Sequence, residues 1–501
     1  MKFLILFLLA ITILAQEVGP QFGGEFIFEI NHSPELTENQ RKTIISENIK
    51  VISELTSLGK ISFSPQSANF SWPLQASKNY NGYSYYGISG FVDHDPNYPN
   101  QLKDYNNGTR TYDLESGYNH KGTDIFLWPF GWVMMENNFV EIISMADGII
   151  IGKDDGNYDR NCGINFNTNW NAVYIRHDNG AVAWYGHMKK NSLTQKNVGE
   201  RVSTGEYLGI VGSSGASTGP HLHLEVYDEN YKLIDPWFGP GNTTITSYWW
   251  IEQKPYYDSK INKIATHSQW PVFPACPETE KTYEQNEFLP GDTICFLTYY
   301  QDQLKGQMTN YKIIQPNGVI WYQWNHSSTE DHYSASYWGW RWIFPANSQQ
   351  GIWKFEVTYN GKVFQHYFKI TRNPTDILEN ISVDNFVLYQ NYPNPFGNRL
   401  SSNSTSTTIK YSLPRQNINA KKSEQSEIIQ RNNEKDNFVT LKIFDVLGKE
   451  IALLVNKNQP PGNYEVKFNT SLLERQLTSG IYFYQLTVGD FRMTKKMIFL
   501  R

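Results

Sequence analysis

Charge of one sign and long apolar runs are both scarce in this sequence, and each shortage excludes a class of protein. The 501 residues carry a formal net charge of -5, and no block of Lys or Arg builds the basic surface that nucleic acids attract. Beyond the N-terminus, no stretch approaches the roughly 18 consecutive apolar residues of a membrane-spanning helix. We therefore expect no nucleic-acid partner and no transmembrane segment in the mature protein.

Cysteine is also scarce, and the chain contains only Cys162, Cys276 and Cys295. In an oxidising compartment an odd number leaves one thiol free or paired between molecules, so three pairings are open. We favour a bridge between Cys276 and Cys295, because it closes a short loop inside one module. Cys162 lies in a Gly- and Asn-rich insertion of another module.

The first residues, MKFLILFLLAITILA, have the composition of a secretory signal peptide. Lys2 supplies the positive end, an apolar run follows from Phe3 to Leu14, and the small residue Ala15 ends it. The run is too short to span a bilayer. Residues 1–15 are therefore predicted to be a signal peptide, and the mature protein is expected to be secreted or held at the cell surface.

Aromatic residues are abundant, at 15% of the chain. They favour a mainly β fold because aromatic side chains fit pleated, half-buried surfaces. At roughly 100–200 residues per domain, the length indicates about three or four units. The predicted order is 1–15 signal peptide, 16–70 N-terminal arm or propeptide, 71–250 antiparallel β domain, 265–372 β-sandwich module, 373–385 linker and 386–501 C-terminal β-sandwich.

From Phe70 onward the pattern is one of short strands separated by turns, as in an antiparallel β domain. A long connection rich in Gly, Asn and Tyr begins at Tyr80, and we expect it to form a wall of a cleft because long loops in compact domains are usually functional or disordered. The predicted strands are Glu141–Ile151, Ala172–His177, Val182–His187, Leu208–Gly212 and His221–Tyr227.

The second β unit, at 265–372, has strands such as Ile294–Tyr300, Gly318–Trp324 and Gly351–Thr358 between turn residues. Seven strands in an immunoglobulin-like sandwich fit this length. Its many tryptophans are interpreted as core and interface residues in preference to a ligand-binding platform.

The stretch GSSGASTGPHLHLEVY, from Gly212 to Tyr227, carries a possible site. Side chains alternate along a strand, so His221 and His223 point to one face. For His-x-His alone, a pair of surface histidines on an edge strand is the simpler interpretation. Partners elsewhere in the sequence are needed to make it a site.

Upstream, NHKGTDIFLW places His120 and Asp124 four residues apart. A catalytic zinc takes three protein ligands and keeps one position for water, and two histidines with a carboxylate form one known set. His120, Asp124 and His223 would complete it, with one Zn²⁺ per catalytic domain. Zinc held in this way makes hydroxide available near neutral pH, which suits peptide hydrolysis.

Two further histidines are candidates for proton transfer. His221 shares the strand face of His223, and His187 ends the predicted strand AVAWYGH. A metallohydrolase needs a group that takes the proton of water and a donor for the oxyanion, so both are predicted to be catalytic. Glu225 is either a partner of His223 or a carboxylate bonded to backbone or water. His177, at a hairpin turn, is interpreted as structural or exposed.

The motifs NHKGTD, WYGHM and GERVSTGEYLGIVGSSGASTGPHLHLEV resemble those of the lysostaphin-type (LytM-like) zinc metalloendopeptidases, which cleave peptide cross-links in bacterial peptidoglycan. The resemblance runs from about Trp72 to Trp237, with the motifs in the right order. It implies that the three predicted ligands bind zinc and that His187 and His221 are the catalytic histidines. It also implies a narrow antiparallel β domain with a groove.

The C-terminal module has alternating strands around a polar stretch, Arg415–Asp436, that is too poor in apolar residues to bury a core. Its segments LYQNYPNPF, FDVLGKEI and SGIYFYQLTVGDFRMTKKMIFL resemble the C-terminal sorting domain of type IX secretion substrates. The resemblance covers about Phe386 to Arg501. It implies export across the outer membrane of a Gram-negative host and removal of this domain.

These features predict a secreted zinc metalloendopeptidase that hydrolyses peptide bonds in peptidoglycan cross-links. Its expected partners are the stem or bridge peptides of peptidoglycan and, for the C-terminal domain, the secretion machinery. Two alternatives stay open: a secreted protease of glycine-rich proteins, and a surface binding or adhesion protein with a silent zinc site.

The N-terminal arm has one predicted helix, which begins after Thr37 as N-cap and continues to Leu55 with apolar residues at helical spacing. Its position between the signal peptide and the metal-binding motifs admits two interpretations. It is either a propeptide that covers the cleft or supplies a fourth ligand, or a simple packing extension.

Overall fold

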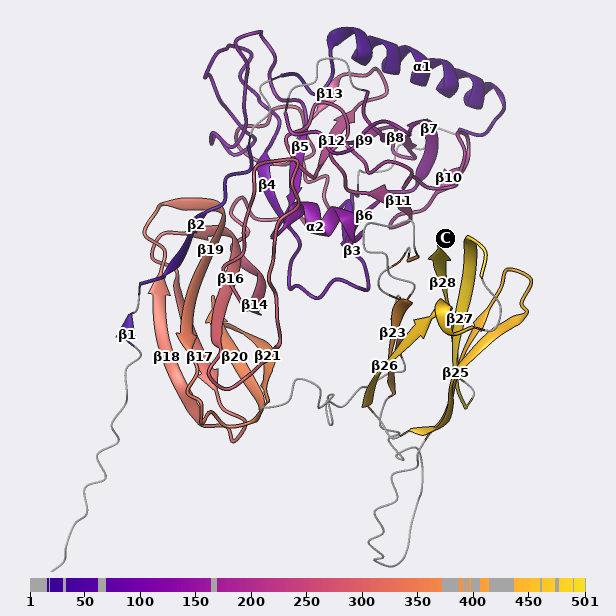
Figure 1. Ribbon diagram of the computed structural model, residues 1–501. Helices are drawn as coiled ribbons and strands as arrows, with labels where there is room; N and C mark the ends of the chain where they lie inside the picture. Colours follow the sequence, from indigo (N-terminus) through magenta and orange to yellow (C-terminus); the bar gives the residue numbers. More distant parts are fainter. Residues whose placement is uncertain are drawn as a thin grey trace, which may run out of the picture. The chain divides into compact units, whose positions relative to one another are not determined.

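Strands outnumber helices throughout the computed structural model (Figure 1), and almost all of their pairings are antiparallel. The prediction of a mainly β fold is thus confirmed. The structure describes residues 16–17, 19–29, 33–61, 69–163, 169–371, 387–389, 391, 394, 396–397, 406–413, 437–459, 462–473, 477–489 and 491–500. The predicted signal peptide, the linker at 373–385 and the polar insertion at 415–436 lie outside these residues. The chain divides into two compact units, Met1–Arg372 and Asn373–Arg501.

The main sheet of the first unit has the strand order β10-β7-β8-β9-β12-β5-β4, with β13 paired to β12. A smaller sheet, β11-β6-β3, and the short helix α2 (Gly131–Glu136) lie in the same unit. The strands are β3 (Leu74–Ala76), β4 (Tyr86–Gly90), β5 (Thr123–Leu127), β6 (Val140–Ile143), β7 (Gly148–Asp154), β8 (Ala172–His177), β9 (Val182–Gly186), β10 (Arg201–Val202), β11 (Tyr207–Ile210), β12 (His221–Tyr227) and β13 (Leu233–Ile234).

Two of the strand predictions for this region are wrong. The stretch Glu141–Ile151 forms two strands in different sheets, because the chain bends at Met145–Asp147 between β6 and β7. The connection that begins at Tyr80 contains β4, which pairs with β5 and so belongs to the main sheet. By contrast, β8 and β12 have the predicted bounds.

A second β unit follows, as two sheets whose side chains share an aromatic core. The predicted core role of its tryptophans holds for Trp324, Trp340 and Trp353, each at most 1% exposed. Its strands are β14 (Lys260–His267), β15 (Glu287–Phe288), β16 (Thr293–Leu304), β17 (Met308–Ile314), β18 (Ile320–Ser327), β19 (His332–Ile343), β20 (Gly351–Tyr359) and β21 (Lys362–Ile370).

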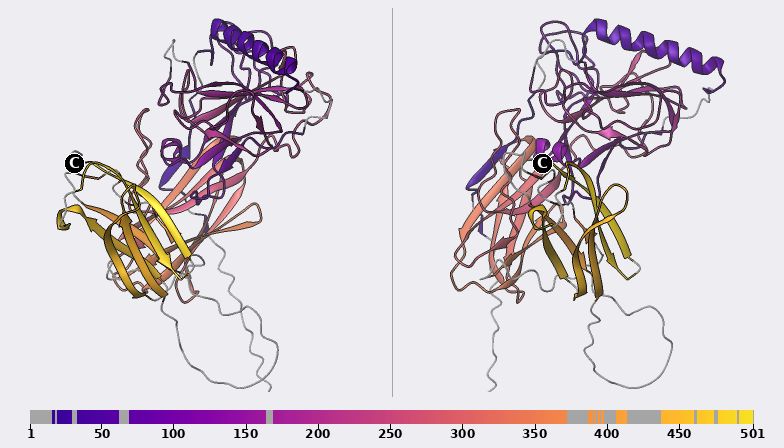
Figure 2. Two further views of the ribbon diagram at one scale, coloured as in Figure 1. Left: turned by 90° about the vertical axis from the view of Figure 1, so that its right-hand side faces the viewer. Right: turned by 45° about the vertical axis from the view of Figure 1, so that its right-hand side comes forward.

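The N-terminal arm contributes to both parts of the first unit. Strand β1 (Gln16–Glu17) pairs with β18, and β2 (Phe22–Glu25) pairs with the edge of β19. Helix α1 (Glu38–Ser57) begins after Thr37, as predicted, with a capping box between Thr37 and Gln40. Its apolar face packs against β7 and its neighbours, and Figure 2 shows the helix lying along the main sheet. Within the described ranges, no helix has the length and apolar character that a membrane crossing requires.

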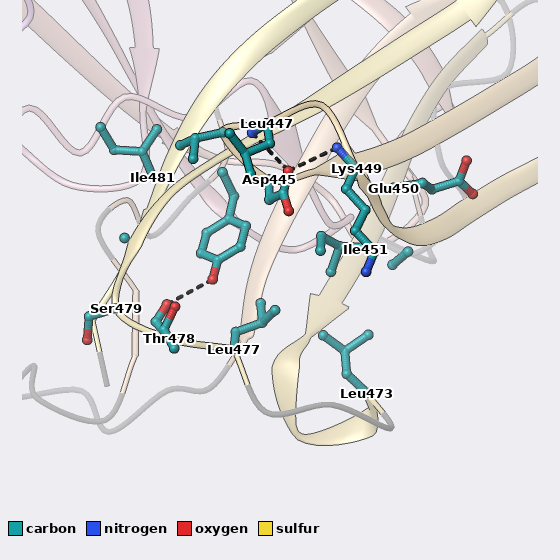
Figure 3. Close-up of a pocket in the computed structure, with 14 residues that line it drawn as sticks. Asp445, Leu447, Lys449, Glu450, Ile451, Leu473, Leu477, Thr478, Ser479 and Ile481 are labelled. Carbon is teal, nitrogen blue, oxygen red and sulfur yellow. Dashed lines mark hydrogen bonds between the residues drawn. The ribbon is translucent and has the colours of Figure 1, made fainter.

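The C-terminal unit has two sheets, β22-β23-β26 and β25-β24-β27-β28, around its own core. Figure 3 shows a pocket in this unit where Tyr482 donates a hydrogen bond to the carbonyl of Thr478 (2.9 Å). The described residues that line this pocket include neither histidine nor cysteine. Its strands are β22 (Val387–Leu388), β23 (Ser406–Leu413), β24 (Asn437–Phe444), β25 (Glu450–Gln459), β26 (Gly462–Asn469), β27 (Gly480–Val488) and β28 (Phe491–Phe499), with a 3-10 turn at Thr470–Leu472.

The favoured disulfide pairing is wrong. Cys162 is bonded to Cys276, with the two Cα atoms 5.6 Å apart, and Cys295 is a free, buried thiol. Cys295 lies within β16 in a cluster of aromatic residues, whereas Cys162 and Cys276 both pack against the core of the main sheet. Arg160, two residues before Cys162, also donates a hydrogen bond to the carbonyl of Pro277, the residue after Cys276.

This pairing predicts a simple labelling result. Denatured, unreduced protein should take up one maleimide per chain, at Cys295, and reduction should expose the other two thiols. Mass spectrometry of the labelled peptides checks this. A cross-linked peptide pair that contains Cys295 would contradict the structure.

Burial of His177 makes stability depend on pH. The side chain is 1% exposed, and burial lowers its pKa from 6.5 to about 4. The unfolded chain therefore binds a proton that the folded protein does not, so the stabilisation is present above pH 6.5 and is lost as the pH falls toward about 4. The loss should be about 2–3 kcal/mol for this group.

We accordingly expect the free energy of unfolding to fall between about pH 7 and pH 4.5, and to fall less steeply in His177→Gln. Urea unfolding of both proteins at several pH values measures the two slopes. The same slope in the variant and the parent would show that His177 does not contribute.

Candidate metal centre and catalytic histidines

The antiparallel pairing of β12 with β5 builds the centre of the site. In this register His223 lies directly opposite Asp124, and directly paired residues point to the same face of a sheet. His223 Nδ1 lies 2.7 Å from Asp124 Oδ1. The other face of β12 carries Leu222 and Leu224, which are buried in the main core, so the register cannot slip without removing them from that core.

His120 reaches the same point from the loop before β5. Its Nδ1 donates to the carbonyl of Phe91 at 2.7 Å, which directs Nε2 toward Asp124 Oδ2, 3.1 Å away. Gly122, between the two residues, is needed for the close approach of the loop. A Cβ there would lie 2.6 Å from Cε1 of His223.

These three residues fit a zinc ion. Ligand atoms of His120, Asp124 and His223, together with Glu35, all lie within 4.8 Å of one another. His120 Nε2 is buried and makes no hydrogen bond in spite of its nearness to Asp124, which is the condition of a lone pair reserved for a metal. Two imidazoles and a carboxylate are the donors that a catalytic zinc prefers.

The electrostatics of the cluster also favour a cation. Burial by itself would raise the pKa of Asp124, but His120 and His223 hold it well below its usual range. Burial would likewise lower the pKa of His223, yet Asp124 and Glu225 raise it to about 10. The carboxylates thus stabilise positive charge at the point where the ligand atoms converge.

His223 is oriented by Glu225, which in turn is held by Arg41. His223 Nε2 donates to Glu225 Oε1 at 2.9 Å, so Nδ1 is the ring nitrogen that faces the ligand cluster. Burial would raise the pKa of Glu225, but Arg41 of helix α1 keeps it well below its usual range. Arg41 binds both carboxylate oxygens, with Nη2 to Oε1 at 2.9 Å, and also the hydroxyl of Tyr227.

His187 and His221 lie beside the metal ligands. Their ring centroids are 4.4 Å apart, and that of His187 is 5.8 Å from that of His223. His187 follows β9 with a φ of 58°, a left-handed conformation that costs roughly 1–3 kcal/mol in a residue other than glycine. Its Nδ1 donates to the carbonyl of Ser214 at 2.5 Å, which fixes the ring with Nε2 toward the cluster.

His221 is held as a neutral imidazole. Its Nδ1 donates to the carbonyl of Gly219 at 2.8 Å, so Nε2 carries the lone pair and lies 3.9 Å from Asp124 Oδ1. Burial first, and then the charge of His187, lower its pKa to about 4. The ring can therefore accept a proton at Nε2.

The structure thus brings all five predicted site residues together, and it adds three that the sequence did not indicate. Glu35 and Arg41 lie far from the motifs along the chain. Tyr112 lies in a loop that has no strand pattern. Tyr112 stacks on His120 with ring centroids 4.4 Å apart and donates to Glu35 at 2.6 Å. His177 is structural, since it is buried against Phe70 and lies away from the ligand cluster.

Three buried residues that can bind a metal, with two histidines beside them, form the kind of site that metallohydrolases have. Family comparison agrees: residues 119–236 match peptidase family M23, and residues 390–500 match the secretion system C-terminal sorting domain. The chain therefore contains a domain of family M23, which is a zinc-dependent family of metallopeptidases, and a C-terminal sorting domain of the kind used in type IX secretion. All five predicted site residues lie within the M23 match.

Several characterised proteins are similar over part of their length. The DD-carboxypeptidase/endopeptidase Mpg of Neisseria meningitidis serogroup B is 53% identical over 55 residues, which are 11% of this chain and 12% of that protein. The peptidoglycan DD-endopeptidase ShyC of Vibrio cholerae is 34% identical over 106 residues, or 21% and 19%. The glycyl-glycine endopeptidase ALE-1 of Staphylococcus capitis is 29% identical over 126 residues, or 25% and 29%. This chain spans less than a third of each relative.

The support given by Arg41 can be tested through metal affinity. Arg41→Met removes the partner of buried Glu225 and loosens His223, so zinc affinity should fall by about 10- to 100-fold. Lys42→Met, an exposed position on the same helix, is the matched control and should leave affinity unchanged. Competition with a chromophoric chelator measures both, after circular dichroism has shown that each variant is folded. Equal affinities in the two variants would contradict this role of Arg41.

Proposed function

We propose that this protein is a secreted zinc metalloendopeptidase that hydrolyses peptide bonds in the cross-links of bacterial peptidoglycan. The observation that carries the proposal is the convergence of His120, Asp124 and His223 on one point beside His187 and His221. The family match and the printed activities of the similar proteins support the reaction class and the substrate.

In this proposal the ion is held by Nε2 of His120, a carboxylate oxygen of Asp124 and Nδ1 of His223. When bound, zinc supplies Lewis acidity, which activates water as a nucleophile and polarises the carbonyl of the scissile bond. Glu225 orients His223 through its Nε2, and the carbonyl of Phe91 orients His120 through its Nδ1.

His221 and His187 move the protons. Neutral His221 accepts the proton of the attacking water at Nε2, because its other nitrogen is held by Gly219. His187 donates at Nε2 to the developing oxyanion or to the leaving amine, with its ring held by Ser214. Two neighbouring imidazoles, one that accepts a proton and one that donates a proton, can act as a base and acid pair.

Export is the remaining part of the proposal. The C-terminal match to a sorting domain supports passage out of the cell by type IX secretion, and the predicted signal peptide would take the chain across the inner membrane. The enzyme would therefore meet peptidoglycan from outside the cytoplasm.

Substitutions separate metal binding from proton transfer. His223→Ala should lose stoichiometric zinc together with activity. His187→Ala should keep one zinc per chain but lose activity by about 10²- to 10⁴-fold, as expected for a general acid or base. Atomic absorption gives the zinc content, and turbidity loss of purified cell walls gives the activity. Full activity in His223→Ala, or after zinc has been chelated, would overturn the proposal.

The substrate is identified by the fragments released. Digestion of purified peptidoglycan should yield separated stem peptides by mass spectrometry, with no cleavage of elastin-like protein. Cleavage of elastin-like protein or soluble polyglycine alone would favour a protease of glycine-rich proteins. Stoichiometric zinc without turnover on any wall preparation would favour a binding protein.

A further inference from the structure

One turn before β12 orients both candidate catalytic histidines. His187 Nδ1 donates to the carbonyl of Ser214 at 2.5 Å, and His221 Nδ1 donates to the carbonyl of Gly219 at 2.8 Å. Each hydrogen bond fixes its ring so that Nε2 is the nitrogen left for proton transfer. The position of residues 213–219 therefore decides where both imidazoles can act.

This turn is paired with a loop that follows β7. The backbone N–H of Asn161 donates to the carbonyl of Ser213 at 3.0 Å, and that of Gly163 donates to the carbonyl of Ser217 at 2.8 Å. The hydroxyl of Ser213 donates in return to the carbonyl of Asn161 at 2.8 Å. Ser213 and Ser217 are fully buried, and Asn161 is 2% exposed. Because water does not reach these groups, loop residues 160–163 hold the turn in place.

Two hydroxyl groups continue from this pairing to His221. Ser213 Oγ lies 2.8 Å from Ser217 Oγ, which lies 3.3 Å from His221 Nδ1. The imidazole that would accept the proton of water is thus connected to the loop through two buried side chains.

Asn171, at the other end of the same insertion, restrains His187. Its backbone N–H donates to Ser214 Oγ at 2.8 Å. Its carbonyl accepts from the N–H of Met188 at 2.9 Å, and its Nδ2 donates to the carbonyl of Met188 at 3.1 Å. The Asn171 side chain also accepts from the N–H of Asn157 in the loop at 2.8 Å. The fully buried Asn171 therefore holds the residue after His187 against both the turn and the loop.

A covalent tether joins this loop to the second β unit. Cys162 lies between the two loop residues that pair with the turn, and it is bonded to Cys276 in the connection between β14 and β15. Arg160 adds hydrogen bonds to the carbonyl of Pro277 at 2.6 Å and to Thr279 Oγ1 at 3.0 Å. All three residues of this connection lie outside the match to family M23, which ends at residue 236. The turn therefore takes part of its support from a segment beyond the matched domain.

We propose that the disulfide between Cys162 and Cys276 is a positioning element of the active site, which acts through loop residues 160–163 on the turn that orients His187 and His221. The inference rests on the proposed function and extends the catalytic unit to the second β unit. The candidate metal ligands are placed by the pairing of β12 with β5 and by the loop before β5. Loss of the disulfide should therefore slow turnover without releasing zinc.

The double variant Cys162→Ala, Cys276→Ala removes the tether, and Cys295→Ala, which lacks only the free thiol, is the matched control. In the zinc-loaded full chain, kcat on soluble cross-linked muropeptides should fall by about 10- to 100-fold in the double variant, because small misplacements of catalytic groups are costly. KM, zinc content and the circular dichroism spectrum should equal those of the control. An unchanged kcat, or loss of zinc together with activity, would overturn the proposal.

Hydrogen exchange gives a second readout that needs no turnover. Peptides covering residues 157–163 and 213–219 should exchange faster in the double variant than in the control, while β5 and β8 should exchange as before. Equal exchange in the two segments would contradict the proposal.

Arg160→Met keeps the covalent bond and removes the hydrogen bonds to Pro277 and Thr279. It tests the same connection should the double variant fail to fold. Its kcat should fall at unchanged zinc content, by less than in the double variant, and a kcat equal to that of the parent would count against the proposal.

A double-mutant cycle with Ser213→Ala tests the route. Because the loop acts on the turn through the hydroxyl of Ser213, Ser213→Ala should lower kcat less in the absence of the disulfide than in its presence. Independent effects of the two changes on kcat would show that the disulfide does not act through the turn. A parent protein that binds one zinc and hydrolyses no muropeptide would instead refute the proposed function, and the exchange measurement would still test the positioning.

Discussion

The register between β12 and β5 is the constraint on which this site depends. It sets His223 opposite Asp124, and the opposite face of β12 secures it by placing Leu222 and Leu224 in the core. A shift of one residue would move both histidines into the apolar core and both leucines into the polar ligand cluster, so apolar packing maintains the geometry of the ligands. The geometry of the candidate ligands is therefore maintained by the same apolar packing that stabilises the sheet.

Buried carboxylates connect the candidate ligands to residues farther from the site. Asp124, Glu225 and Glu35 lie in an interior that penalises charge, and each is compensated by a histidine or by Arg41. An unpaired buried charge is strongly destabilising, so every member of this network restrains its neighbours. The consequence is a site whose support comes from helix α1 as well as from the main sheet, although the family match begins only at residue 119.

Local pattern was sufficient to predict much of the fold and the residues of the candidate site. Short strand-like runs between turn residues gave the bounds of β8 and β12, and Thr37 with its helical spacing gave the start of α1. The prediction of one continuous strand at Glu141–Ile151 was wrong because the apolar run contains a bend. Strand β4 was missed because its Gly- and Tyr-rich sequence does not alternate. Neither feature leaves a period in the sequence, because a bend can interrupt an apolar run without changing its composition and a strand covered on two faces does not need to alternate.

The sequence by itself determined which side chains are available for the chemistry: the motifs around His120, Asp124, His187, His221 and His223 are local, and strand geometry directs their side chains. Only the tertiary structure decided what surrounds them. Glu35 meets His187 across 152 residues of chain and Arg41 meets Glu225 across 184, while Cys162 joins Cys276 across 114. No periodicity encodes such pairs, because they arise when separately folded elements pack together. The candidate site residues could thus be selected from motifs, whereas the distant residues that surround them could be found only in the folded chain.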